Sequence, residues 1–164
     1  MTDHTDDVAR LGELLEDIDF CMLTTIDGSG QLHARPMSTQ KAEFDGTLHF
    51  LTDRDSHKVE DIERDPQVLA AYADTKAHTY VSVHGRARIA RDEALIEELW
   101  SPAHRAWWPD GRNDPSIMVL SIDVDRADYW ESSGSKLTQL IGFAKAATGH
   151  GSGKDLGEQG TIRP

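Results

Sequence analysis

The chain has 164 residues, a length that suits one domain with a single sizeable core. Its 29 Asp and Glu residues against 17 Lys and Arg residues give a formal net charge of −12. This charge argues against binding to nucleic acids or anionic membranes, because a protein binds either of them through dense positive charge. No apolar run approaches the roughly 20 residues that cross a bilayer, and the acidic start MTDHTDDVAR lacks the parts of a signal peptide, so we expect a soluble cytoplasmic protein.

The N-terminal part predicts a helix followed by a hairpin. Apolar residues recur at helical spacing from Val8 to Ile18. The stretches 20–26 (FCMLTTI) and 31–40 (QLHARPMSTQ) are typical strands, and the DGSG between them tolerates the positive φ of a tight turn. Cys21, the one cysteine, has no CxxC or CxxH neighbour, so we expect a small apolar core residue and no metal site.

The middle of the chain alternates strands and a helix. A strand at 47–52 (TLHFLT) precedes a helix from Ser56 to Arg64, which Asp65-Pro66 ends because the residue before proline avoids the α region. Strands follow at 67–74 and 78–90, and the second alternates polar and apolar residues, as a strand with one buried face does.

The C-terminal part predicts a helix at 92–100 with Asp92 as its N-cap, an aromatic connection, two further strands at 116–124 and 126–132, and a helix at 137–147. We expect one domain over residues 1–148 and a Gly-rich tail over 149–164, in which residues 161–163 add a short edge strand. About six strands in hairpin-joined runs favour a mainly β fold, a small antiparallel barrel with peripheral helices.

Two clusters of polar residues suggest anion binding. Arg35 precedes Pro36, so its backbone is held extended and its guanidinium suits a phosphate, although a surface ion pair explains it as well. Ser56, His57 and Lys58 begin a helix directly after a strand, where free N–H groups and the helix dipole favour an anion. A capped helix with solvated charges is the alternative.

These motifs together resemble the FMN-binding split barrels of the pyridoxamine 5'-phosphate oxidase-like superfamily. In that superfamily an Arg-Pro-Met strand precedes an aromatic-x-Thr strand end and a Ser-Arg-Lys helix start, as HARPM and FLTDRDSHK do here with His57 in place of arginine. The segment WSPAHRAWWPDGRNDPSIMVLSIDVDRADYWES is similar to the general stress protein branch.

The resemblance implies a six-stranded split barrel and a homodimer with flavin in two clefts at the subunit interface. It implies a ring or phosphate contact for Arg35, ring-edge contacts for residues 50–52, a phosphate cradle at 56–58, and a weaker assignment at Gln40 or Lys41, where lysine is common. Trp130 is expected near the cleft, with a core indole as the alternative. The implied cofactor-binding set is Arg35, Gln40, Phe50, Leu51, Thr52, Ser56, His57, Lys58 and Trp130.

The function implied is FMN binding, with FAD as the alternative cofactor, in an oxidoreductase that acts with NAD(P)H or a small organic substrate of unknown identity. A non-enzymatic flavin-binding or flavin-buffering stress protein is the second hypothesis, and deazaflavin or haem use is a third. Pyridoxamine phosphate oxidation is not expected, because the C-terminus lacks the substrate-phosphate arginines of those enzymes. Trp100, Trp107 and Trp108 are expected in the core or the dimer interface, with a substrate wall as the alternative.

Overall fold

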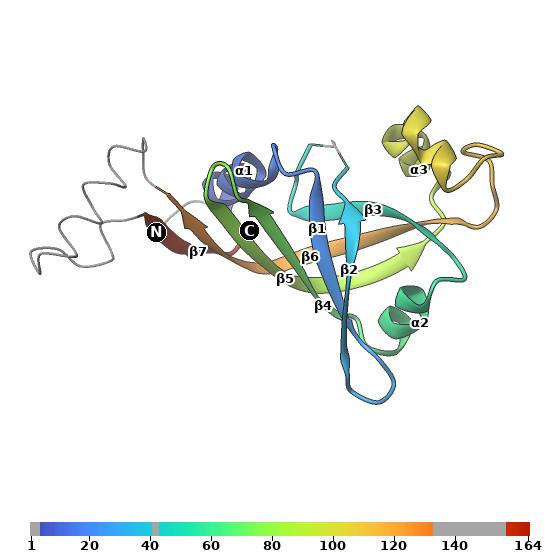
Figure 1. The fold of residues 1–164 in the computed structure, drawn as a ribbon, viewed down its shortest axis with the longest axis horizontal. Coiled ribbons are helices and arrows are strands. Elements are labelled where there is room, and N and C mark those ends of the chain that lie inside the picture. Colours follow the sequence, from blue (N-terminus) through green and yellow to red (C-terminus); the bar gives the residue numbers. More distant parts are fainter. Residues whose placement is uncertain (1–3, 41–42, 133–156) are drawn as a thin grey trace, which may run out of the picture.

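The computed structural model describes residues 4–40, 43–132 and 157–164, and the predicted helix at 137–147 lies outside them. Its strands form one antiparallel sheet in the order β2-β1-β4-β5-β6-β3, with β7 paired to β6 (Figure 1). The strands are β1 (Phe20–Ile26), β2 (Leu32–Ser38), β3 (Thr47–Asp53), β4 (Gln67–Asp74), β5 (Thr79–Ala90), β6 (Ile117–Glu131) and β7 (Glu158–Ile162); the helices are α1 (His4–Leu15), α2 (His57–Arg64), α3 (Glu93–Leu99) and the 3-10 helix η1 (Pro102–Ala106).

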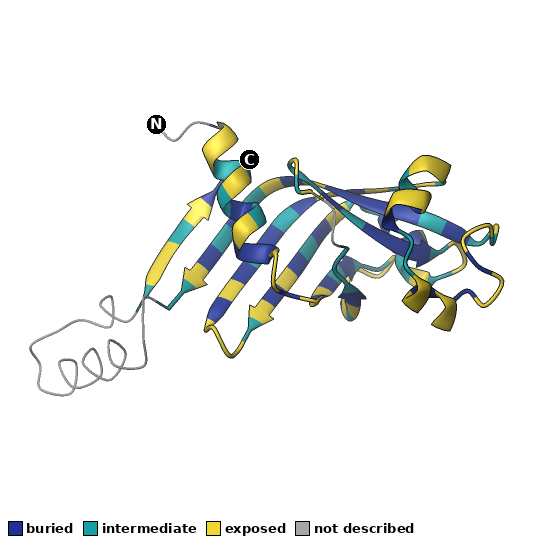
Figure 2. Ribbon diagram, turned by 90° about the horizontal axis from the view of Figure 1, so that it is seen from above, coloured by how far each residue is buried: buried dark blue, intermediate teal, exposed yellow. Residues whose placement is uncertain are grey.

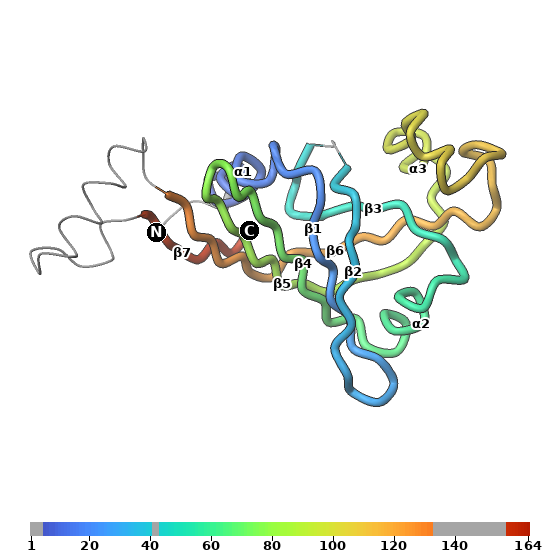
Figure 3. The backbone as a smooth tube through the Cα atoms, in the orientation of Figure 1, coloured from blue at the N-terminus to red at the C-terminus, as the bar shows by residue number. Residues whose placement is uncertain are grey.

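This architecture confirms the predicted fold class, a mainly antiparallel β fold with peripheral helices that is consistent with a split barrel. Within the described residues the sheet has seven strands and does not close, because β2 and β3 end its path without pairing to each other. Strand β7 runs along β6 from Glu158 to Ile162, where the sequence predicted a shorter edge strand at residues 161–163. Figure 3 traces the β1–β2 hairpin, whose turn projects from the body of the molecule.

The main core lies between the inner face of the sheet and α1. Apolar residues of the predicted stripe, including Leu11 and Leu14, are buried against strand residues such as Leu23 and Val83. Along β1, β4 and β5 buried residues alternate with more exposed ones, as Figure 2 shows, because successive side chains point to opposite faces. The alternation predicted for residues 78–90 is therefore confirmed.

The prediction of two separate strands at 116–124 and 126–132 is wrong. They form one continuous strand, β6, which pairs with β5 along most of its length. The register shifts between His84, opposite Arg126, and Gly85, opposite Val124, so Asp125 is an extra residue without a partner. This β-bulge interrupts the two-residue periodicity, which is why the sequence pattern indicates a break there.

A second, smaller core holds α3 and η1 against the ends of β3 and β6. Leu51, Ile96, Trp108 and Ile117 are buried together there. Asp92 caps α3, as predicted, since its carboxylate accepts a hydrogen bond from the N–H of Leu95 at 3.0 Å. In the part of the chain that the structure describes, no helix is both long and apolar enough to cross a membrane.

Candidate functional site

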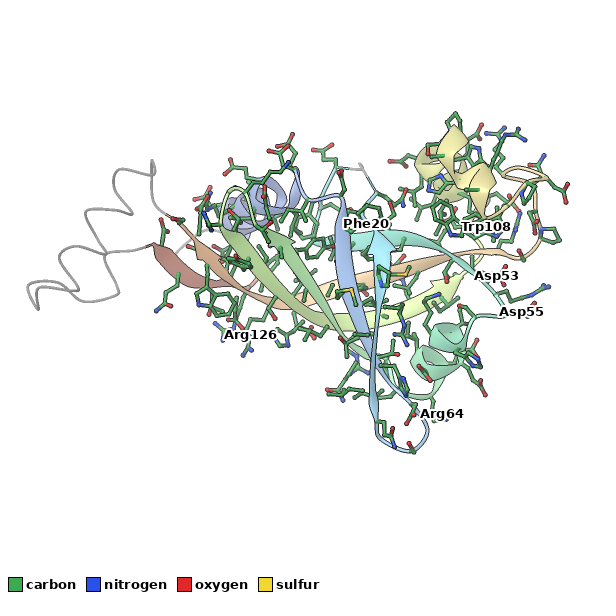
Figure 4. The ribbon with its side chains drawn as sticks, viewed as in Figure 1. Phe20, Asp53, Asp55, Arg64, Trp108 and Arg126 are labelled. Carbon is green, nitrogen blue, oxygen red and sulfur yellow. The ribbon has the colours of Figure 1, made fainter. Side chains whose placement is uncertain are left out.

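A cavity of about 380 Å³ lies between β2, the end of β3, the start of α2 and the segment around η1. We call it the cation cavity, because Arg35 and Lys58 both line it. Figure 4 labels three other lining residues, Phe20 from β1, Asp53 from β3 and Trp108 after η1. The full lining is Phe20, Arg35, Pro36, Met37, Ser38, Gln40, Leu51, Thr52, Asp53, Lys58, His104, Trp107 and Trp108.

Two buried polar residues, Thr25 and Asp61, hold the side chain of Arg35 in position. Its Nη1 donates to Thr25 Oγ1 at 2.6 Å and to the Leu23 carbonyl at 3.3 Å, and its Nη2 lies 3.7 Å from Asp61 Oδ2. Thr25 in turn donates to Asp61 at 2.8 Å. Burial lowers the pKa of Arg35, while Asp61 opposes that shift. The guanidinium therefore remains a cation held in one position.

Lys58 is the second residue of α2 and has no ion-pair partner among the described residues. Its Nζ donates to Thr52 Oγ1 at 3.2 Å, and Thr52 is buried. Burial lowers the pKa of Lys58 most, the charge of Arg35 lowers it further, and Asp53 raises it. A partly buried ammonium beside a second cation is costly, so this position favours an anion.

Ser56 does not act as a side-chain cap of α2, the simpler of the two roles considered for it. Its backbone carbonyl accepts from Val59, but its side chain makes no capping hydrogen bond. Instead Ser56 Oγ lies 3.3 Å from Thr52 Oγ1, so Thr52 joins Ser56 and Lys58 into one polar group. The first N–H groups of a helix lack partners within the helix, which adds donors at this end.

Five of the nine residues predicted for the cofactor line the cavity, and a sixth contacts one of them. Arg35, Gln40, Leu51, Thr52 and Lys58 line the cavity, while Ser56 reaches it through Thr52. Phe50 is buried in the main core, because it points to the opposite side of β3 from Leu51. His57 is exposed, and Trp130 is exposed far along β6 beside Tyr80 and Gln159. Neither His57 nor Trp130 lines this cavity, and Lys41 lies outside the described residues.

One wall of the cavity is aromatic, a feature that the sequence suggested only as the alternative for its tryptophans. Trp107 is 67% exposed, whereas Trp108 is buried. The buried imidazole of His104 packs with its ring centroid 5.3 Å from Trp100 and 6.4 Å from Trp108. Its Nδ1 accepts from the N–H of Ser101 at 2.9 Å.

The sequence interpretation missed several parts of the site. Phe20, Met37, Asp53 and His104 line the cavity without having been proposed for it, and Asp61 supports Arg35 from α2. No sequence pattern identifies Asp61 as a residue that supports the site. An acidic residue next to the apolar Ile62 on a helix is only a weak signal of burial. The alternation along β2 places Arg35 and Met37 on one face, and that pattern would have identified Met37.

Residues 6–154 match the family model of pyridoxamine 5'-phosphate oxidase-like proteins. General stress protein 26 of Bacillus subtilis is 34% identical over 100 residues, which cover 58% of this chain and 69% of that protein. A general stress protein 26 structure from Jannaschia sp. CCS1 covers 100% of both chains with a TM-score of 0.78 and 25% identity. The general stress FMN/FAD binding protein of Xanthomonas citri gives a TM-score of 0.68 at 26% identity, over 80% of this chain and 92% of that one.

Proposed function

The chain belongs to the pyridoxamine 5'-phosphate oxidase-like family, and from that premise we propose that the cation cavity binds FMN. The observation that carries the proposal is Lys58, a partly buried ammonium without an ion-pair partner in the described chain, beside Arg35. A phosphate dianion placed there offsets the repulsion between the two cations. The name of the Xanthomonas citri neighbour, an FMN/FAD binding protein, supports a flavin as the ligand.

The residues around the cavity fit the two ends of FMN. Arg35, Lys58 and the hydroxyls of Thr52 and Ser56 offer donors for the phosphate, and His57, which is exposed and outside the lining, lies next to Lys58 at the start of α2. Apolar side chains of the lining suit the flavin ring. Bound flavin would supply hydride or single-electron transfer, while the protein holds and orients it. We assign FMN as the cofactor, with FAD as the alternative.

We also propose a homodimer, because the outer face of the sheet carries a row of exposed apolar residues. Met22 is opposite Pro36 across β1 and β2, and Tyr80 is opposite Trp130 across β5 and β6. Phe20, which is 60% exposed, belongs to the same face and also lines the cavity. Exposed apolar patches of this kind mark interaction surfaces. A second copy on this face would place the cavity and Trp130 at the interface, and sedimentation equilibrium of wild type and Met22→Glu tests it.

The first experiment is titration of the purified protein with FMN, FAD and riboflavin, followed by flavin absorbance. We expect FMN to bind more tightly than riboflavin, and Lys58→Met to weaken FMN at least tenfold while leaving riboflavin nearly unchanged. Lys76→Met, at an exposed turn, is the matched control. Equal losses for FMN and riboflavin would remove Lys58 from the phosphate site, and failure of all three flavins to bind would overturn the proposal.

We propose that the flavin-loaded protein is an oxidoreductase. A measurement of catalytic turnover distinguishes this activity from a role in which the protein only stores flavin. Saturable oxidation of NADH or NADPH by the flavin-loaded protein would support the enzyme. Tight FMN binding with negligible turnover would instead favour the flavin-buffering role, for which the same site suffices.

A further inference from the structure

His104 carries its proton on a defined nitrogen. A backbone N–H can only donate, so the Nδ1 that accepts from Ser101 at 2.9 Å is unprotonated. Burial lowers the pKa of His104, although the hydrogen bond from Ser101 opposes the shift, and this direction agrees with the neutral ring that an accepting Nδ1 requires. The single proton of the neutral imidazole therefore lies on Nε2, and this tautomer is fixed by the turn that begins η1.

The Nε2–H group has no hydrogen-bond partner in the described part of the chain, yet His104 is 9% exposed and lines the cation cavity. Contacts with Trp100 and Trp108 prevent the ring from turning away. This nitrogen is not among the side-chain atoms buried away from solvent without a partner, so it is open to the cavity, where a ligand acceptor can replace water. The donor is thus in place before any ligand arrives, which reduces the ordering cost of binding.

The wall around His104 suits an uncharged, flat ligand. Trp107 is largely exposed beside it, and Trp108 and Phe20 add further aromatic surface to the lining. The nearby arginines are engaged elsewhere, since Arg105 donates to the Pro109 carbonyl and Arg112 pairs with Glu97. With Arg35 and Lys58 assigned to phosphate, this wall offers no free cation among the described residues, and Asp53 disfavours a second anion.

We propose that His104 and Trp107 form a subsite for a second ligand, a planar conjugated carbonyl compound of the quinone class. The Nε2–H of His104 donates to a carbonyl oxygen while the ligand ring packs on Trp107. This subsite rests on the proposed flavin function, because the second ligand shares the cavity with FMN. A neutral imidazole that lost this proton would become an anion, so His104 binds and positions the carbonyl and does not transfer a proton to it.

The test uses FMN-loaded protein and duroquinone, with binding followed by calorimetry and by the infrared carbonyl stretch. In His104→Asn the side-chain oxygen can accept from Ser101 in place of Nδ1, but the Nε2–H donor is lost. In His104→Gln an amide N–H lies close to the position of Nε2. With FMN at saturating concentration for each protein, we expect duroquinone to bind about tenfold more weakly to His104→Asn, with less loss in His104→Gln. The carbonyl stretch should fall on binding to wild type and not on binding to His104→Asn.

Trp107→Leu provides a second variant at an exposed position, and it should weaken duroquinone without affecting the fold. FMN binding with equal duroquinone affinity in wild type, His104→Asn and Trp107→Leu would overturn the subsite and leave the flavin site intact. An unshifted carbonyl stretch in wild type would also overturn it. Absence of FMN binding to wild type is a different result, which overturns the proposed function.

Discussion

The guanidinium of Arg35 lies 3.7 Å from the carboxylate of Asp61, and Thr25 Oγ1 hydrogen-bonds to both side chains. Asp61 belongs to the buried face of α2, the helix that also carries Lys58. One buried polar cluster thus ties the cation on β2 to the helix that provides the second cation. The spacing of the two charges depends on this contact between strand and helix.

Asp61→Asn is expected to lower the free energy of unfolding by about 2 kcal/mol, because it leaves the partly buried Arg35 without its counter-charge. Urea unfolding of the flavin-free protein measures the change. Asp55→Asn is the control, since that side chain is 81% exposed and its loss should stay within about 0.5 kcal/mol. Equal unfolding midpoints for the two variants would show that the cluster does not stabilise the fold.

Lys58 should give the flavin-free protein a distinctive dependence of stability on pH. The pKa of Lys58 is lowered in the folded state, chiefly by burial, so between that pKa and the ordinary lysine value the unfolded chain binds more protons. The free energy of unfolding should then rise with pH relative to Lys58→Met as pH approaches about 10. Urea unfolding of both proteins from about pH 8 to about pH 10 checks this sign. Parallel curves for wild type and variant would contradict it.

Gly85 should be intolerant of alanine. An added Cβ would lie 2.4 Å from the carbonyl oxygen of Asp123 and 2.6 Å from Ile122 Cγ2, at the bulge between β5 and β6. We expect Gly85→Ala to cost about 3 kcal/mol, because backbone must move to make room. Gly30→Ala is a useful comparison, since it meets nothing within 4 Å and strains only a φ of +83°, a cost of about 1 kcal/mol. Thermal melts that rank the two variants the other way would refute this account of the bulge.

Cys21 should be unreactive in the folded protein. The thiol is buried beside Tyr72, and burial raises its pKa to about 11. The thiolate is the reactive form, so modification by iodoacetamide at about pH 8 should be slow until urea unfolds the chain. Mass spectrometry of samples quenched over time measures the rate. Rapid labelling without urea would indicate that β1 opens on its own.

Local patterns predicted much of this fold, and the failures have physical causes. Strand alternation, the Asp65-Pro66 stop and the Asp92 cap depend on neighbours in sequence, so their signals are visible in the residues themselves. The bulge at Asp125 appeared as a gap between strands, because alternation fails there while pairing to β5 continues. The proximity of Arg35 and Lys58 does not come from pairing of successive strands, because β2 and β3 lie at opposite ends of the strand order, yet the structure places both side chains at one cavity.

Other parts of the site depend on contacts between residues distant in sequence. Asp61 reaches Arg35 from a helix, and His104 reaches the cavity only because α3 and η1 fold back over β3. Neither has a local signature. Strand alternation predicts that Phe50 and Leu51 face opposite sides of β3. The family motif instead grouped Phe50 with Leu51 and Thr52 as contacts of the flavin ring.

The charge of Lys58, which has no ion-pair partner in the described ranges, has a consequence for the lifetime of the protein in a cell. A ligand that binds only the folded chain raises its stability in proportion to the logarithm of ligand concentration. Because the ammonium is costly until an anion lies beside it, the unliganded chain unfolds more often and is exposed to proteases more often. Proteolytic turnover would then slow when the anionic ligand is plentiful, and the amount of protein would follow the supply of that ligand without any change in gene expression.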